Sequence, residues 1–153
     1  MSIYGYCRIS TAKQSIDRQI RNIKAEYPTA HIVQEAYTGT SIFRPEWLKL
    51  YRILKSGDIV VFDSVSRMSR NAEEGFALYD DLYHKGIRLV FLKEHHIDTE
   101  TYKKALSGSI AMTGTNVDFI LKGINEYLMA LAKEQIKLAF EQSEKEVADL
   151  HQR

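Results

Sequence analysis

The chain has 153 residues, of which 44% are hydrophobic and 27% are charged, proportions that fit one globular domain with a buried core. The formal net charge is +1 and there is a single cysteine, which excludes a disulfide framework and a zinc site built from cysteine clusters. No run approaches the roughly 18 apolar residues of a membrane span, so we expect a soluble protein of the reducing cytoplasm with no membrane partner.

Positive charge is concentrated in the N-terminal half of the chain. Residues 1–72 carry 11 Lys and Arg against 6 Asp and Glu, a net charge of +5. Residues 73–153 carry 10 Lys and Arg against 14 Asp and Glu, a net charge of −4. We therefore expect a basic surface around the N-terminal half, where a polyanion could be held.

The chain opens with a predicted strand followed by a helix. Residues 2–9 are rich in the aromatic and β-branched residues that favour strands. The polar stretch after them repeats isoleucine at helical spacing as far as about residue 26, with Ile16, Ile20 and Ile23. A strand that leads into a helix is the opening of an alternating α/β chain.

A second strand and a second helix follow. Residues 31–35 predict a short strand, and residues 37–44 predict a loop rich in Thr, Ser and Gly. Pro45 suits the first turn of a helix, which ends at Gly57. Its expected inward side chains are Trp47, Leu48, Tyr51 and Leu54.

Two more strands complete the predicted sheet. Residues 59–62 are a continuous apolar run, typical of a strand covered on both faces, and residues 87–92 supply another strand. Between them, residues 72–84 have the periodicity of a helix, and we expect its aromatic stripe in the core. The alternation predicts an α/β fold with a mostly parallel central sheet of about four strands flanked by helices.

The last third of the chain divides into a predicted loop and a long helix. Residues 95–116 have no clear period, so we expect a mobile loop. Residues 117–153 contain no proline and one glycine and carry an interrupted apolar stripe, which predicts a helix of about 55 Å at about 1.5 Å per residue. One small core cannot cover this stripe, which indicates a second copy of the chain as partner. We therefore divide the chain into a core at 1–116 and an oligomerisation helix at 117–153.

A serine and several arginines lie at predicted strand ends. Arg8 and Ser10 are two residues apart at the end of the first strand, so alternation points both side chains to the same side. Arg44 closes the loop after the second strand, and Arg67 and Arg70 follow the third strand at a spacing that one helical turn brings onto one face. Ligands of open α/β sheets bind at this edge.

Such a cluster suits phosphoryl transfer. The reaction depends chiefly on positive charge placed where the phosphate oxygens gain negative character. Guanidinium groups stay charged at any working pH and contact phosphate in bidentate pairs. A lone serine at a strand end is more often a turn or capping residue, but beside these cations Ser10 can act as a nucleophile because they stabilise its alkoxide.

The segment Y-G-Y-C-R-I-S-T-A-K-Q-S-I-D-R-Q-I at residues 4–20 resembles the opening signature of the resolvase/invertase family of serine site-specific recombinases. The resemblance continues through the T-G-x-S-x-x-R-P loop, the G-D-I-V-V-F strand and the pair Arg67-x-x-Arg70. It covers about the first 95 residues well. It implies that the chain contains the catalytic domain of such a recombinase.

The resemblance also implies roles for individual residues. The nucleophile is Ser10. The side chains that hold the scissile phosphate are Arg8, Arg67 and Arg70, with Arg44 assisting them. The family's polar positions near the nucleophile and the DNA phosphates match Gln14, Gln19 and Thr38.

The family's reaction cleaves both strands of two sites in double-stranded DNA, with a 5′-phosphoserine bond on each strand and free 3′-hydroxyls. The resemblance implies a homodimer that becomes a tetramer in the synaptic complex, exchanges half-sites by subunit rotation and religates them. It implies neither a metal nor a nucleotide cofactor, and no G-x-x-x-x-G-K or G-x-G-x-x-G run follows a strand. We also expect a C-terminal DNA-binding domain beyond the long helix.

The chain departs from the family pattern at two places. The family's second motif usually reads Asp-Arg, whereas Ser66 precedes Arg67 here, and a serine hydroxyl carries no charge. This leaves either a slower enzyme or one that uses another acid or base. The chain also has extra residues before the end of the long helix, so the family's helix glutamate could match Glu134, Glu144 or Glu146.

Two other functions remain open. A small phosphatase or hydrolase could use Ser10 on a similar scaffold, although a monomeric enzyme would not need the long helix. A non-catalytic oligomerisation or DNA-binding module could keep the fold after losing activity, which Ser66 would explain.

Two further features are given structural interpretations. Cys7 alternates away from Arg8 and is expected to be a small buried hydrophobe. The group His95, His96 and Asp98 is interpreted as part of a loop, because adjacent residues rarely converge on one metal ion.

Overall fold

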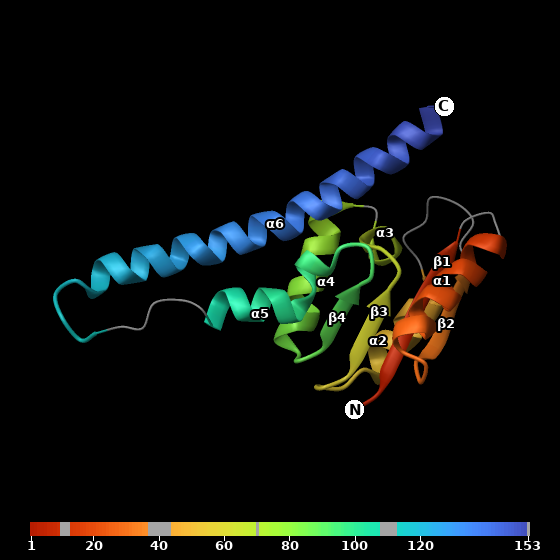
Figure 1. The fold of residues 1–153 in the computed structure, drawn as a ribbon, viewed down its shortest axis with the longest axis horizontal. Helices are drawn as coiled ribbons and strands as arrows, with labels where there is room; N and C mark the ends of the chain where they lie inside the picture. The colour runs from red at the N-terminus through yellow and green to blue at the C-terminus, as the bar shows by residue number, and fades with distance from the viewer. Residues whose placement is uncertain (10–12, 37–43, 70, 108–112, 153) are drawn as a thin grey trace.

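The computed structural model describes residues 1–9, 13–36, 44–69, 71–107 and 113–152. Four strands form one sheet in the order β2-β1-β3-β4, and every neighbouring pair is parallel. The strands are β1 (Ile3–Ile9), β2 (His31–Ala36), β3 (Ile59–Phe62) and β4 (Arg88–Phe91). The predicted α/β fold with a parallel four-stranded sheet is confirmed (Figure 1).

Helices cover both faces of the sheet. On one face, Cys7 and Val61 pack against Ile16 and Ile23 of α1 (Lys13–Glu26). The other face packs against α2 (Pro45–Ile53) and α4 (Ala72–His84) through an aromatic layer that includes Tyr6, Trp47, Phe62, Tyr79 and Phe91. Because helices lie on both sides, every residue of β3 is buried, which explains its continuous apolar run.

One expected core position in α2 was wrong. Leu48 is 39% exposed, whereas Leu50 is 2% exposed and packs in the core. The inward face of α2 follows spacings of three and four from Trp47 through Leu50 to Leu54. Leu48 lies off this face because successive helical residues are rotated by about 100°.

Two glycines lie in the turns that precede β3 and β4, and α2 ends at Ile53, before the expected Gly57. Gly57 has φ 94° and Gly86 has φ 78°, a backbone region that favours glycine. The N–H of Gly57 donates to the carbonyl of Gly86 at 2.9 Å, so the two turns lie together. A Cβ on Gly86 would also lie 2.3 Å from Oγ of Ser56. These turns close the N-terminal edge of the sheet.

The expected loop at residues 95–116 is partly helical. It contains a 3-10 turn η1 (His95–Ile97) and the helix α5 (Thr99–Ser107), while residues 108–112 lie outside the described ranges. Ile97 and Tyr102 are buried in the core, and the N–H of Phe91 donates to Asp98 Oδ1 at 2.7 Å. Burial against β4 therefore orders a segment whose own periodicity is weak.

The predicted long helix is α6 (Asp118–Gln152), which extends well beyond the core (Figure 1). Around residues 136–140 it packs on α4 and on the short α3 (Val65–Met68). Gly75 permits close approach, because a Cβ there would lie 2.5 Å from the ring of Phe140. The first half of α6 leaves large apolar side chains exposed, among them Phe119, Ile120, Tyr127 and Leu131. None of the helices in the described ranges is both long and apolar enough to cross a membrane.

Candidate active site

Three of the predicted arginines meet around α3, at the C-terminal edge of the sheet. Arg8 Nη2 donates to the carbonyl of Ser66 at 2.7 Å, and Arg44 Nη1 donates to the carbonyl of Met68 at 2.8 Å. Arg67 Nη1 donates to the carbonyl of Arg8 at 3.2 Å. These contacts join three segments that are far apart in the sequence, as predicted from the strand ends.

The shortness of α3 explains why arginine side chains bind to its carbonyl groups. A single helical turn leaves its last carbonyls without intrahelical partners, and guanidinium N–H groups satisfy them. Arg8 is also buried, and a buried charge is retained only where partners compensate for its lost hydration. Arg8 is therefore a fixed element of the fold rather than a solvated surface charge, and Arg44 and Arg67 are partly buried beside it.

Gln19 holds the end of β1. Its Oε1 accepts from the backbone N–H of Arg8 at 3.1 Å, and its Nε2 donates to the carbonyl of Arg8 at 3.1 Å. The pairing of β1 with β3 ends at Tyr6 and Phe62, so the buried Gln19 amide takes the place of a neighbouring strand. The predicted residue Gln19 thus fixes the backbone two residues before Ser10.

Glu35, a buried carboxylate at the end of β2, was not among the predicted site residues. Glu35 Oε1 accepts from the hydroxyl of Tyr6 at 3.1 Å and from the N–H of Trp47 at 3.1 Å. It therefore caps the start of α2, where Arg44 itself makes no side-chain cap. Burial is the main cause that raises the pKa of Tyr6 above its usual value, so the hydroxyl remains a donor. The available signal was an acidic residue at the end of a predicted strand, residues 31–35.

Asp63, which directly follows β3, was not among the predicted site residues either. Its Oδ1 accepts from Asn22 Nδ2 at 2.9 Å, and its Oδ2 lies 3.7 Å from Lys93 Nζ. Nearby, the hydroxyls of Ser64 and Ser66 are 2.7 Å apart. An acid placed directly after a buried apolar strand was the signal that could have found this group.

The prediction that Cys7 is a buried hydrophobe is confirmed. Cys7 lies on the sheet face opposite the aromatic layer and is fully buried. Burial raises the pKa of its thiol to about 12, the charge of Asp63 adds to the rise, and Arg67 opposes it. At neutral pH the thiol is protonated and is a poor nucleophile.

Several predicted site residues fall outside the described part of the chain. Ser10, Thr38 and Arg70 lie outside the described ranges, as do the side chains of Gln14, Glu144 and Glu146. Glu134 is exposed on α6. The helical turn expected to carry both Arg67 and Arg70 ends at Met68, because the following Ser69 has an extended backbone.

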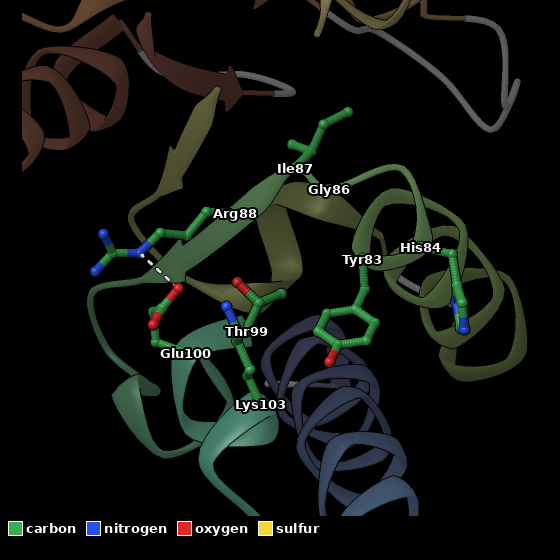
Figure 2. Close-up of a pocket in the computed structure, with 8 residues that line it drawn as sticks. All are labelled: Tyr83, His84, Gly86, Ile87, Arg88, Thr99, Glu100 and Lys103. Atoms are coloured by element: carbon green, nitrogen blue, oxygen red, sulfur yellow. Dashed lines mark ion pairs between the residues drawn. The ribbon is translucent and has the colours of Figure 1, made fainter. Parts of the chain in front are cut away.

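A pocket of about 340 Å³ lies at the other edge of the sheet (Figure 2). Its wall includes Arg88, which begins β4, and Arg88 Nε is 3.7 Å from a carboxylate oxygen of Glu100. In Figure 2, Thr99 and Lys103 lie between Glu100 on one side and Tyr83 on the other. Because parallel strands begin at this edge, the pocket is separate from the arginine cluster. Within the described ranges, no three His, Cys, Asp or Glu side chains gather to hold a metal ion.

Comparisons with known proteins converge on one family. The model described as "Resolvase, N terminal domain" matches residues 3–146. The chain is 32% identical over 99 residues to a resolvase from Clostridium perfringens (strain 13 / Type A), which covers 63% of this chain and 52% of that protein. It is 30% identical over 91 residues to the transposon Tn21 resolvase of Escherichia coli, covering 60% and 47%. The chain thus spans about half the length of these curated relatives.

Solved structures share the fold. A resolvase family site-specific recombinase from Streptococcus pneumoniae aligns with 100% of this chain and 99% of its own, with a TM-score of 0.52 and 18% identity. A serine recombinase from Sulfolobus solfataricus aligns over 84% and 98%, with a TM-score of 0.50 and 18% identity. At this identity the likeness concerns the fold.

Proposed function

The chain belongs to the resolvase N-terminal domain family, the catalytic domain of serine recombinases, and on that premise we propose that it cleaves and rejoins double-stranded DNA through Ser10. The observation that carries the proposal is the junction of Arg8, Arg44 and Arg67 at the C-terminal edge of the sheet. Guanidinium groups held there before DNA binds are suited to stabilise a phosphate that gains negative charge.

In the proposed cleavage step, the Ser10 oxygen attacks the phosphorus of a DNA phosphodiester. A bond forms between that oxygen and phosphorus, and the bond from phosphorus to the 3′ oxygen breaks. Ser10 loses its proton, and the departing 3′ oxygen gains one. The phosphoserine bond retains the energy of the phosphodiester, so the reverse reaction rejoins DNA without a nucleotide cofactor.

The side-chain roles follow from charge and position. We assign Arg8, Arg67 and Arg70 to the scissile phosphate, with Arg44 assisting. Gln14 and Thr38 are assigned to the DNA phosphates, and Gln19 to the catalytic centre. The contact of Gln19 with both backbone groups of Arg8 supports a role in keeping that strand end in place.

We further propose that the chain acts as a homodimer and, on paired DNA sites, as a tetramer. The exposed apolar side chains of the first half of α6 support this, because such a stripe is stabilised by burial against a partner. Residues 1–116 would then form the catalytic core, and residues 117–153 the oligomerisation helix. Sedimentation should show a dimer or larger species, and a monomer at high concentration would contradict it. We also propose a cytoplasmic location, because the proposed substrate is double-stranded DNA.

Trapping a covalent protein-DNA adduct tests the reaction. Nicked duplexes with a randomised central sequence, labelled at their 3′ ends, would be incubated with the protein and run on a denaturing gel. We expect a labelled adduct with the native chain and none with Ser10→Ala, because only the nucleophilic oxygen is removed. Circular dichroism would verify that the variant is folded.

The outcomes separate the alternatives. An adduct of equal yield in Ser10→Ala would exclude Ser10 as the nucleophile. DNA binding without an adduct in the native chain would favour the non-catalytic module. Release of inorganic phosphate from a small phosphate ester, without an adduct, would favour the hydrolase.

A further inference from the structure

The carboxylate of Asp63 is buried beside the candidate active site and has no role in the proposed reaction. Asp63 is 2% exposed. Its side-chain partners among the described residues are the amide of Asn22 and the ammonium of Lys93, the latter on a side chain that is 59% exposed. Such a pair is weakened by water. A buried carboxylate is stable only if other interactions compensate for its lost hydration, so nearby positive charges are needed to stabilise Asp63.

The strand register places Asp63 next to the end of β1. Pairing of β1 with β3 ends at Tyr6 and Phe62, so Cys7 and Asp63 come next on the two strands. Alternation puts both side chains on the face covered by α1. Asp63 therefore lies on the side of the sheet from which Gln19 contacts β1.

Two contacts from α1 show how near this carboxylate is to the Arg67 guanidinium. Gln19 donates to the carbonyl of Arg8, the same atom that accepts from Arg67. Asn22 is three residues further along α1 and donates to Asp63. Residues three apart are neighbours on a helix face, so Asp63 lies about one helical turn from the Arg67 contact.

The pKa of the buried Cys7 thiol depends on the charges of both Asp63 and Arg67. Burial is the largest cause of its raised pKa, the Asp63 carboxylate raises the pKa further, and Arg67 lowers it. Both charges therefore act on one atom within a poorly hydrated region. Opposite charges in such surroundings attract more strongly than they would in water.

We propose that Asp63 is a positioning residue for Arg67, whose guanidinium it stabilises electrostatically from about one helical turn away at the C-terminal end of β1, and that it supplies the negative charge absent at Ser66. The inference rests on the function proposed above. The Ser66 hydroxyl carries no charge and contacts the Ser64 hydroxyl. Asp63 acts on the same arginine from the α1 side of the sheet, so the site keeps a carboxylate at a different position in the chain.

Four proteins test this role: the native chain, Asp63→Asn, Ser66→Asp and the double variant. The substrate is a nicked, 3′-labelled duplex selected by the adduct assay. The measurements are the adduct formation rate at saturating DNA, the DNA dissociation constant and the thermal midpoint. Asp58→Asn is a matched control, because Asp58 is also buried but lies at the opposite end of β3.

We expect Asp63→Asn to lower the rate at saturating DNA about 10-fold, because a displaced arginine stabilises the reacting phosphate less well. The dissociation constant should not rise, since removing a negative charge does not weaken attraction to phosphate. Ser66→Asp added to Asp63→Asn should restore the rate to within about threefold of the native rate, because it returns a carboxylate beside Arg67. Asp58→Asn should lower the thermal midpoint and leave the rate per folded molecule unchanged.

Two results would overturn the inference while leaving the proposed function intact. One is a native rate in Asp63→Asn. The other is a rate loss that Ser66→Asp does not restore, which would indicate a purely structural role. Failure of the native chain to form any adduct would instead remove the proposed function, and this inference with it.

Discussion

The two edges of the sheet are made by the same four strands and hold different chemistry. At the C-terminal edge, Arg8, Gln19 and Asp63 bring buried charged and polar side chains together. At the N-terminal edge, Gly57 and Gly86 make tight turns that are joined by a backbone hydrogen bond. Burying charge is costly, so an edge that accumulates it is the stronger candidate for a ligand site.

A pocket alone does not identify a functional site in this fold. The pocket of about 340 Å³ is at the N-terminal edge, where Arg88 is already paired with Glu100 (Figure 2). Both of these side chains are nearly half exposed, so water screens their interaction. Arginines bound to backbone carbonyls, one of them buried, are more informative than the size of a cavity.

The largest expected difference between the two edges is the effect of arginine substitutions on the rate of DNA cleavage. We expect Arg67→Ala and Arg8→Ala each to lower the adduct rate by about 100-fold or more, because each removes a preorganised donor to the phosphate. Arg88→Ala is the matched control at the other edge and should keep the native rate. The rate of adduct formation in a single turnover measures the difference. Equal rates in all three variants would show that the arginines at the C-terminal edge have no special role in cleavage.

The glycine turns should affect stability rather than chemistry. Gly86→Ala should lower the free energy of unfolding by about 2 kcal/mol, because alanine is strained at positive φ and its Cβ meets Ser56. Gly57→Ala should lower it by only about 1 kcal/mol, since that Cβ has nothing within 4 Å. Urea denaturation measures both values. A larger loss in Gly57→Ala would show that the contact with Ser56 does not contribute.

Asp58 should make the N-terminal edge sensitive to acid. Burial alone would raise its pKa, but the N–H groups of Lys55 and Ser2 donate to the carboxylate and lower the pKa overall. Because the pKa is lower in the folded state, the ionised carboxylate stabilises the fold at pH values above the unfolded pKa of about 3.9. This stabilisation is lost as the pH falls through the folded-state pKa. Asp58→Asn should therefore cost about 1 kcal/mol near pH 7 and progressively less below about pH 4.

Thermal unfolding of both proteins across this pH range measures the effect. The gap in thermal midpoint between the native chain and Asp58→Asn should narrow as the pH falls. A gap that is constant with pH would show that the charge of Asp58 does not stabilise the turn.

The sequence by itself determined the succession along the chain of the four strands and of α1, α2, α4 and α6, and the arginines at the strand ends. The apolar run of β3 and the helical repeat of α1 are local patterns, readable because burial imposes them on successive residues. Arg8, Arg44 and Arg67 could be predicted as neighbours because parallel strands end at a common edge.

Only the tertiary structure decided which side chains meet across that framework. The segment that contains η1 and α5 is ordered by burial of Ile97 and Tyr102 in the core, and its sequence has no hydrophobic periodicity that predicts this. The roles of Glu35 and Asp63 can be recognised only in the folded structure, because their hydrogen-bond partners Trp47 and Asn22 are distant in the sequence. The contacts of a buried carboxylate depend on strand order and helix placement, and these arise from packing of the whole domain.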